Sequence, residues 1–188
     1  MSLYHVFDVE EHSTRKNILL EEIGDAFGYE CETTDFKGDY TSKISKTNYT
    51  WDNRRPAGRI KWPYCLQRND YNSFVKFLET NYKERGRSWR VFQDWYNQYN
   101  PNSGSDHPFH NHSKSNGNLV NGIACIYYVE LYDESLVTVL KDPETGEEVI
   151  PKVKEGQILT FDAYIDHKSP RNFTDTRKTI IAFNIEFK

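Results

Sequence analysis

The spacing of apolar residues divides the chain into two parts at Trp89. In the first part, apolar residues recur at intervals of three and four, the period of a helix with one buried face. This pattern predicts a short strand over residues 3–9, a helix over 14–27, and a second helix between Asp70, its N-cap, and Gly86, its end. The apolar stripes are Ile18, Leu19, Ile23 and Phe27 in the first helix and Phe74, Phe77, Leu78 and Tyr82 in the second.

From Trp89 onward the period changes to two, which is typical of strands. Strands are predicted over 89–99, 123–131, 135–140, 157–165 and 178–187, separated by turns rich in Gly, Asn, Asp and Pro. With few helices between them, these strands predict an antiparallel sandwich or small barrel supported by the N-terminal helices. The expected fold class is therefore mainly β.

Composition narrows the class of protein further. The chain has 188 residues and a mean hydropathy of −0.82, but 15% of its residues are aromatic, which is enough to build a core in a single domain, 1–188. It contains no apolar run long enough for a membrane span, and its first residues do not resemble a signal peptide. We therefore expect a soluble, cytoplasmic protein, located in the host cytoplasm if it is encoded by a phage.

Cysteines and charge exclude several functions. The three cysteines are odd in number and lack C-x-x-C spacing, so they predict buried thiols: Cys31, Cys65 and Cys125. The net charge is −4, and the basic cluster of the chain lies in a loop-like segment beside two tryptophans, which argues against general nucleic-acid binding. This cluster consists of Arg54, Arg55, Arg59 and Lys61.

Histidines carry the clearest chemical signal. Three of the six lie close together in the sequence DHPFHNH, as His107, His110 and His112, and His167 follows the predicted strand at 157–165. Residues i and i+2 of an extended segment point to the same side, so His110 and His112 can face one point. A ligand from a distant strand would complete a facial metal site with open positions. The alternative is that these histidines are structural, hydrogen-bonded residues.

A second candidate lies ten positions after His167. Strand alternation places Arg177, Thr179 and Ile181 on one face, and it places Lys178, Ile180 and Ala182 on the other. A guanidinium and a hydroxyl on one face form a good seat for a carboxylate, because Arg donates two parallel hydrogen bonds. The alternative for Arg177 is a surface salt bridge.

Together these residues resemble the 2-oxoglutarate and Fe(II)-dependent oxygenases, specifically the prolyl-hydroxylase-like branch and its short phage and bacterial relatives. The resemblance covers residues 89–188 and implies a double-stranded β-helix of the jelly-roll or cupin-like kind. It makes 89–188 the catalytic core and 1–88 a helical support with a substrate-facing loop. In that family an H-x-D pair and a later His bind iron, and an Arg followed two positions later by Ser or Thr binds 2-oxoglutarate.

The resemblance implies a role for each matching residue. The iron ligands would be His110, His112 and His167, and the distal carboxylate of 2-oxoglutarate would bind Arg177 and Thr179. The segment NGIACIYYVELY resembles the family strand whose second Tyr also contacts that carboxylate, which assigns Tyr128. The segment WYNQYNPNSGSDHPFHNH places Tyr99 on the pocket-facing strand and His107 just before the iron. With O2, such a site would hydroxylate a C–H bond and release succinate and CO2.

The sequence departs from the family at one ligand, since His112 stands where the family usually has Asp. Three neutral imidazoles also bind zinc, so ligand type alone does not identify the metal. Two alternatives therefore stay open. The first is a cupin-like enzyme that holds zinc or another metal without 2-oxoglutarate, and the second is a β-sandwich protein with structural histidines.

The substrate of such an enzyme would be a peptide, a protein or a small molecule. In this fold class variable loops usually hold the substrate, which points to residues 31–65. The aromatic and basic side chains there that would suit a substrate are Tyr40, Tyr49, Trp51, Arg54, Arg55 and Trp62. The same residues could instead pack as a loop over the barrel, and the oligomeric state is not legible from the sequence.

Overall fold

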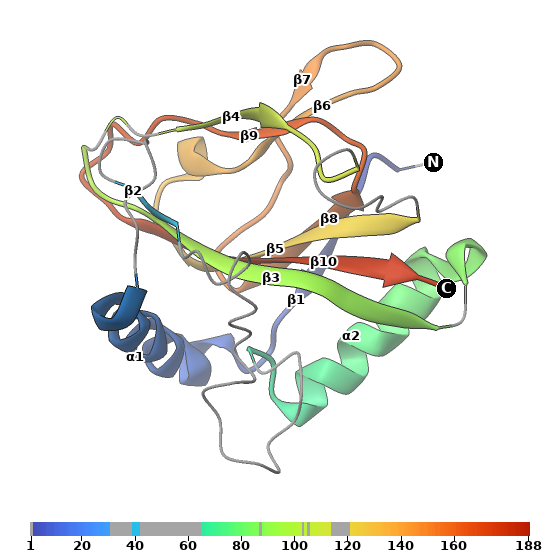
Figure 1. Ribbon diagram of the computed structural model, residues 1–188, viewed down its shortest axis with the longest axis horizontal. Helices are drawn as coiled ribbons and strands as arrows, with labels where there is room; N and C mark the ends of the chain where they lie inside the picture. The colour runs from blue at the N-terminus through green and yellow to red at the C-terminus, as the bar shows by residue number, and fades with distance from the viewer. Residues whose placement is uncertain are drawn as a thin grey trace.

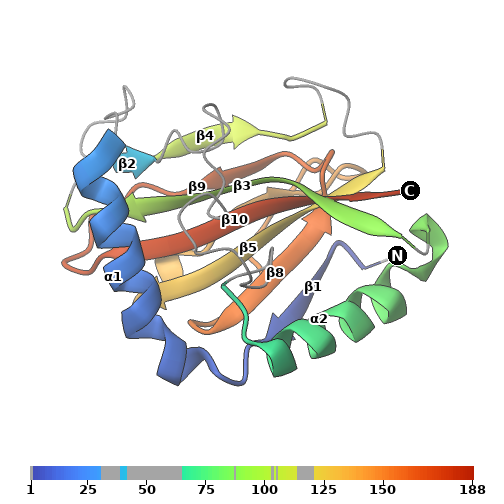
Figure 2. The ribbon, with the colours of Figure 1, turned by 60° about the horizontal axis from the view of Figure 1, so that its bottom comes forward.

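The computed structural model describes residues 2–30, 39–41, 65–86, 88–102, 104, 106–113 and 121–188. Its strands form two antiparallel sheets, and two helices cover the face of the larger sheet that is turned away from the smaller one (Figures 1 and 2). The helices are α1 (His12–Glu30) and α2 (Arg68–Asn81), and short 3₁₀ turns span Lys83–Arg85 and Glu134–Leu136. The mainly β fold class is therefore confirmed.

The larger sheet has six strands in the order β1, β8, β5, β10, β3 and β2. These are Tyr4–Asp8, Gln157–Asp162, Gly122–Leu131, Lys178–Phe187, Trp89–Tyr99 and Asp39–Thr41, respectively. The smaller sheet has the order β4, β9, β6 and β7, which are His107–His110, His167–Ser169, Val139–Lys141 and Glu148–Val149. Because β1 pairs with β8 and β2 with β3, the first part of the chain also contributes strands to the larger sheet.

Strand alternation divides the buried residues of the larger sheet between two cores. On β10, Ile181, Phe183 and Ile185 pack toward the helices, in a core that includes Leu19, Ile23, Phe74 and Leu78. Ile180 of the same strand packs between the two sheets, in a core that includes Tyr99, Ile126, Tyr128, Leu140 and Leu159. The space between the sheets is therefore a second interior, separate from the one beneath the helices.

The second predicted helix forms, but Asp70 is not its N-cap. The N-cap is Gln67, which makes no side-chain capping bond, and Asp70 lies inside the first turn. The Asp70 carboxylate is buried and accepts hydrogen bonds from the backbone N–H groups of Glu10 and Glu11, at 2.9 and 3.0 Å. The Asp70 carboxylate, which the local pattern predicts as a helix cap, thus binds the turn before α1 instead.

Gly86 ends this helical region as predicted, after the 3₁₀ turn that follows α2. Its φ of +136° lies in the left-handed half of backbone space, which glycine tolerates. A Cβ at this position would also collide with the carbonyl oxygen of Lys188. The chain therefore needs a residue without a side chain here in order to turn back beside its own C-terminus.

Most predicted strands are present, but residues 135–140 do not form one continuous strand. The Asp133 carboxylate accepts a hydrogen bond from the backbone N–H of Ser135 at 2.8 Å, which starts a 3₁₀ turn, and β6 begins only at Val139. The predicted strand at 157–165 ends at Asp162, and His167 starts β9 in the other sheet. Short strands such as β4 and β9 escape a period-based prediction because they span too few residues to show a period.

Two of the three cysteines, Cys65 and Cys125, are buried, as predicted. Cys31 and most of the predicted loop at 31–65 lie outside the described residues. Among the residues that the structure describes, no helix is long and apolar enough to span a membrane.

Candidate metal and cosubstrate site

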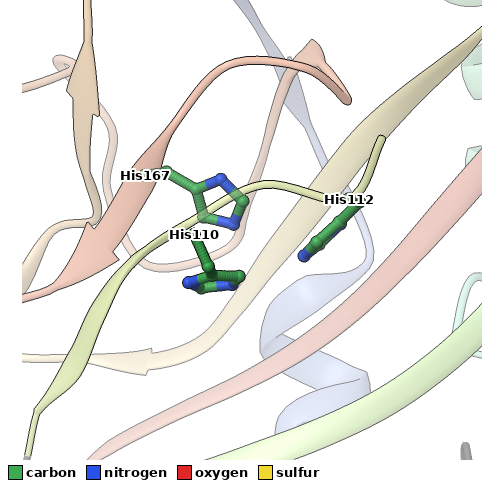
Figure 3. A group of neighbouring side chains, drawn as sticks. All are labelled: His110, His112 and His167. Atoms are coloured by element: carbon green, nitrogen blue, oxygen red, sulfur yellow. The ribbon is translucent and has the colours of Figure 1, made fainter. Parts of the chain in front are cut away.

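Three histidines converge between the two sheets, as the sequence predicts. His110 ends β4, His112 follows two residues later, and His167 begins β9, where it pairs with His110 across the ladder. Their candidate ligand nitrogens all lie within 4.8 Å of one another. The three rings point toward a common centre (Figure 3), and the ring centroids of His110 and His167 are 4.3 Å apart.

A hydrogen bond fixes the orientation of each ring. The Nδ1 of His110 donates to the carbonyl of Pro108 at 2.8 Å, and the Nδ1 of His167 donates to the carbonyl of Ile165 at 3.0 Å. The Nδ1 of His112 donates to the side-chain oxygen of Asn184 on β10, at 2.6 Å. Oxygen acceptors assign the proton to Nδ1 in all three rings, so each Nε2 keeps its lone pair for a metal ion.

Burial keeps these rings neutral. Burial, and then the charge of neighbouring histidines, lower the pKa of His112 to about 4 and that of His167 well below its ordinary value near 6.5. The unfolded chain takes up protons with a pKa near 6.5, so the folded state binds fewer protons below that pH. Their contribution to stability is therefore fully present above pH 6.5 and is lost as the pH falls toward the folded-state values.

His107 lies at the start of β4, beside this group. Its ring stacks on that of His110, with centroids 4.0 Å apart and an interplanar angle of 22°. Burial, and then the neighbouring His110 and His112, lower the pKa of His107 to about 3. His107 is thus a neutral, pocket-lining imidazole next to the three candidate ligands, which agrees with its predicted position just before the metal.

A narrow pocket extends from the three histidines between the sheets and holds about 30 Å³ of open space. Strands of both sheets contribute to its wall. It is lined by Trp95, Asn97, Tyr99, His107, His110, His112, Cys125, Ile126, Thr138, His167, Ser169, Ile180 and Ala182.

Both predicted tyrosines lie in the core between the sheets. Tyr99 lines the pocket directly. Tyr128 is fully buried, and its hydroxyl accepts a hydrogen bond from the backbone N–H of Thr138, a pocket-lining residue, at 3.1 Å. Burial raises the pKa of Tyr128 to about 12, so it stays a neutral phenol that can still donate its proton.

Arg177 and Thr179 share one face, as predicted, but that face is turned away from the pocket. Two guanidinium nitrogens of Arg177 donate to the Glu130 carboxylate at 2.8 and 3.0 Å, and Thr179 donates to the same carboxylate. Thr179 has the strand parity of Ile181, which packs toward the helices. The expectation that Arg177 and Thr179 bind a carboxylate ligand in the pocket is therefore corrected, because both side chains bind the carboxylate of Glu130 instead.

The opposite face of β10 carries a cation that the sequence interpretation missed. Lys178 is 1% exposed, and its Nζ donates to the Leu136 carbonyl at 2.6 Å and to the Ser169 hydroxyl at 2.7 Å. The Nζ lies 4.6 Å from the centroid of the Tyr99 ring. Since Tyr99 and Ser169 line the pocket, the ammonium group contacts two residues of the pocket wall.

A signal for Lys178 was present in the sequence. Lys178 has the same parity as Ile180 and Ala182, in a strand where six of the ten residues are apolar. A lysine at such a position must bury its charge, which costs free energy unless the charge is paired or hydrogen-bonded. The interval of ten residues from His167 favoured Arg177, although strand alternation places Arg177 and Lys178 on opposite faces of the strand.

Residues 31–65 were expected to contact the substrate. Tyr40 lies within β2, and its side chain is not among those described. The other candidates in that segment, Tyr49, Trp51, Arg54, Arg55 and Trp62, lie outside the described residues. Their role remains a prediction.

Comparison with solved structures identifies similar folds. A viral collagen prolyl hydroxylase from Paramecium bursaria Chlorella virus-1, in complex with 2-oxoglutarate, has a TM-score of 0.61 at 12% identity, covering 100% of this chain and 97% of that one. A prolyl 4-hydroxylase from Pseudomonas putida has a TM-score of 0.61 at 9% identity, with coverages of 99% and 93%.

A third similar structure is HygX from Streptomyces hygroscopicus with nickel, 2-oxoglutarate and hygromycin B bound. Its TM-score is 0.62 at 9% identity, covering 100% of this chain and 84% of that one. No family model and no curated protein matches the sequence. The likeness is thus one of fold, and the chain has the double-stranded β-helix fold of these 2-oxoglutarate-binding proteins.

Proposed function

We propose that the protein is a non-haem Fe(II) and 2-oxoglutarate-dependent dioxygenase that hydroxylates a C–H bond and releases succinate and CO2. One observation supports this proposal most strongly: three oriented imidazoles line a pocket, and a buried ammonium group contacts two other residues of its wall. The imidazoles suit a divalent transition metal with open coordination positions. The ammonium suits an anionic ligand that reaches the metal from within the barrel.

The residues fit iron and 2-oxoglutarate, which together with O2 supply the oxidising chemistry when bound. His110, His112 and His167 would hold the metal, each through Nε2. Lys178 would neutralise the distal carboxylate, since an ammonium in a water-poor site attracts an anion more strongly than it does in water. The two sheets keep bulk water away from the reacting centre.

Cosubstrate binding requires side-chain movement. The open space of about 30 Å³ is room for roughly one water molecule, which is less than a five-carbon diacid needs. Lys178 is the side chain best placed to move, because it donates to Leu136 and Ser169 in the structure and could give up these neutral acceptors for a carboxylate. A charge-assisted hydrogen bond to a carboxylate is stronger than one to a neutral oxygen.

An anaerobic titration with Fe(II) and then 2-oxoglutarate tests the proposal. We expect a visible metal-to-ligand charge-transfer band in the wild type and none in His110→Ala or His167→Ala, because two imidazoles hold a divalent ion weakly. His5→Ala is the matched control, since His5 packs against Phe77 and Tyr82 outside this pocket and its loss should leave the band intact. Absence of the band in the folded wild type would contradict the proposal.

Metal analysis separates the two alternatives. The three-histidine set also fits zinc, and a protein that holds zinc and does not bind 2-oxoglutarate would be a cupin-like metalloprotein. A protein that neither binds nor is stabilised by any transition metal would be a β-sandwich with structural histidines.

The proposal covers the reaction type and leaves the substrate open between a peptide or protein and a small molecule. The similar structures include a collagen prolyl hydroxylase and a protein with hygromycin B bound, so one fold accommodates very different molecules. We propose that residues 31–65 contribute to substrate contact. Replacing Trp51 and Arg54 with Ala together should then weaken substrate turnover without affecting the charge-transfer band.

A further inference from the structure

The three candidate metal ligands differ in what holds their rings. His110 and His167 each donate from Nδ1 to a backbone carbonyl two positions earlier in the chain. Such an acceptor comes with the local backbone and does not depend on another side chain. His112 lies beyond the end of β4, and its ring donates to the side chain of Asn184, which is 72 positions away on β10. Among these three rings, that of His112 therefore depends on a distant residue for its orientation.

Asn184 is a buried amide on the pocket-facing side of β10. It has the strand parity of Ile180 and Ala182, which line the pocket, and it is 2% exposed. The pairing of β10 with β3 shifts register between Asn184 and Ile185. Register shifts of this kind change the direction of a side chain and are frequent beside functional sites. The larger sheet thus places an amide against His112 at the point where its ladder is irregular.

The hydrogen bond from His112 to Asn184 determines which ring nitrogen faces the common centre. A neutral imidazole carries one N–H, and Oδ1 is an acceptor, so the 2.6 Å bond keeps the proton on Nδ1 and leaves the lone pair on Nε2. The ring also packs against Trp95 and His167, at centroid distances of 5.3 and 4.9 Å, but ring packing does not select a tautomer. Without the amide, Nε2 would lose its fixed direction and its fixed protonation.

The amide of Asn184 can also orient a carboxylate. Rotation by half a turn exchanges Oδ1 and Nδ2, which replaces an acceptor with a donor at the same place. In His112→Asp, the new carboxylate would therefore accept a hydrogen bond from Nδ2. Leucine has a similar shape but offers neither a donor nor an acceptor, so Asn184→Leu removes both possibilities.

We propose that Asn184 is the positioning residue for the metal ligand at position 112: its amide presents Nε2 of His112 to the metal, and it would orient the carboxylate of His112→Asp in the same way. The inference rests on the proposed function through the metal centre alone, because it concerns metal binding and not 2-oxoglutarate. It makes the larger sheet part of a centre whose other two ligands come from the smaller sheet.

Calorimetric titration of the metal-free protein with Ni(II) tests the proposal when Asn184→Leu is measured in three backgrounds. In the wild type and in His112→Asp, Asn184→Leu should weaken Ni(II) binding by about ten- to a hundredfold, because the ligand loses its orienting partner. In His112→Ala no side chain remains to be oriented, so the same change should alter the weaker Ni(II) affinity by less than about twofold. A structural role would instead lower the affinity by the same factor in all three backgrounds.

A control variant and a spectroscopic measurement accompany the titrations. Asn121→Leu is the matched control, because the Asn121 amide donates to the Arg85 carbonyl at 2.8 Å and does not line the pocket; it should keep the wild-type Ni(II) affinity. Proton NMR of the Co(II)-loaded wild type should show three exchangeable, paramagnetically shifted imidazole N–H signals. Asn184→Leu should shift or broaden one of them, that of His112, whereas a general disturbance of the sheet would move all three.

Wild-type Ni(II) affinity in a folded Asn184→Leu protein would overturn the inference, and so would an equal loss in the His112→Ala background. Equal affinity of His112→Asp with and without Asn184→Leu would overturn the role toward a carboxylate. If Asn184→Leu does not fold, Asn184→Ala replaces it, with the same expected results. A wild type that binds no divalent transition metal, or that binds Ni(II) but not 2-oxoglutarate, would instead refute the proposed function.

Discussion

The assignment of the carboxylate-binding cation can be tested with two neighbouring substitutions. Lys178→Met removes the buried ammonium, and Arg177→Gln removes the guanidinium paired with Glu130. Because Lys178 is 1% exposed, its pair with a carboxylate would form out of water. Losing one member of such a pair costs about 2–5 kcal/mol, which weakens the binding of 2-oxoglutarate about 30- to 5000-fold.

Arg177→Gln should instead lower the stability of the fold and leave the binding of 2-oxoglutarate nearly unchanged. The Glu130 side chain is 6% exposed and loses two charge-assisted hydrogen bonds, whereas the Arg177 side chain is 40% exposed, so solvent compensates for part of the loss. We expect the free energy of unfolding to fall by about 1–3 kcal/mol, with 2-oxoglutarate affinity within about threefold of the wild type.

Urea unfolding and anaerobic calorimetry with Ni(II) and 2-oxoglutarate measure the two quantities separately. Lys178→Met should remain folded, because Met fills a similar volume and removes a buried charge. The reasoning is refuted if Arg177→Gln lowers 2-oxoglutarate affinity as much as Lys178→Met does, or if a folded Lys178→Met binds as tightly as the wild type.

Three other predictions concern the metal ligands, acid stability and the turn after α2. His112→Asp should bind Ni(II) within about tenfold of the wild type, because a carboxylate is also a good metal ligand. A loss as large as that of His110→Ala in the same titration would contradict the expectation that Asp can replace this imidazole. The metal-free protein should lose stability as the pH falls below 6.5, because the pKa values of His107 and His112 are lowered to about 3 and about 4 in the folded state. The free energy of unfolding should fall by about 1.4 kcal/mol at pH 5.5 for each of these two residues. Urea midpoints that do not change between pH 7 and pH 5 would contradict this. Gly86→Ala should lower the free energy of unfolding by about 1–3 kcal/mol in thermal unfolding, because it combines a φ of +136° with a clash at Lys188. Gly146→Ala should lower it less, because the added Cβ meets nothing within 4 Å.

The metal centre was predictable from the sequence because its signal is local. His110 and His112 are two residues apart in an extended segment, and that spacing alone brings their rings to one side. His167 was found through a family resemblance and not through spacing. The pairing of β4 with β9 that places it beside His110 is a contact over 57 positions, which no local pattern encodes.

The cosubstrate end of the site was harder to predict because it depends on which face of β10 is turned inward. Both faces of that strand are buried, so hydrophobicity does not distinguish them. The distinction comes from Glu130 on the neighbouring strand, which captures Arg177 and Thr179. A contact with the neighbouring strand therefore determines which face of β10 is turned toward the pocket, and strand alternation alone does not.

The hydrogen bonds of the three histidine rings have a consequence for how the protein would be loaded. All three rings have an acceptor at Nδ1, and the two cores on either side of the larger sheet consist of hydrophobic residues that include none of these histidines. Metal uptake should therefore leave the backbone unchanged, unlike in domains that fold only around their ion. A chelator should strip the protein to a folded apo form with an unaltered far-ultraviolet circular dichroism spectrum, and added metal should restore the centre at a rate set by access to the pocket.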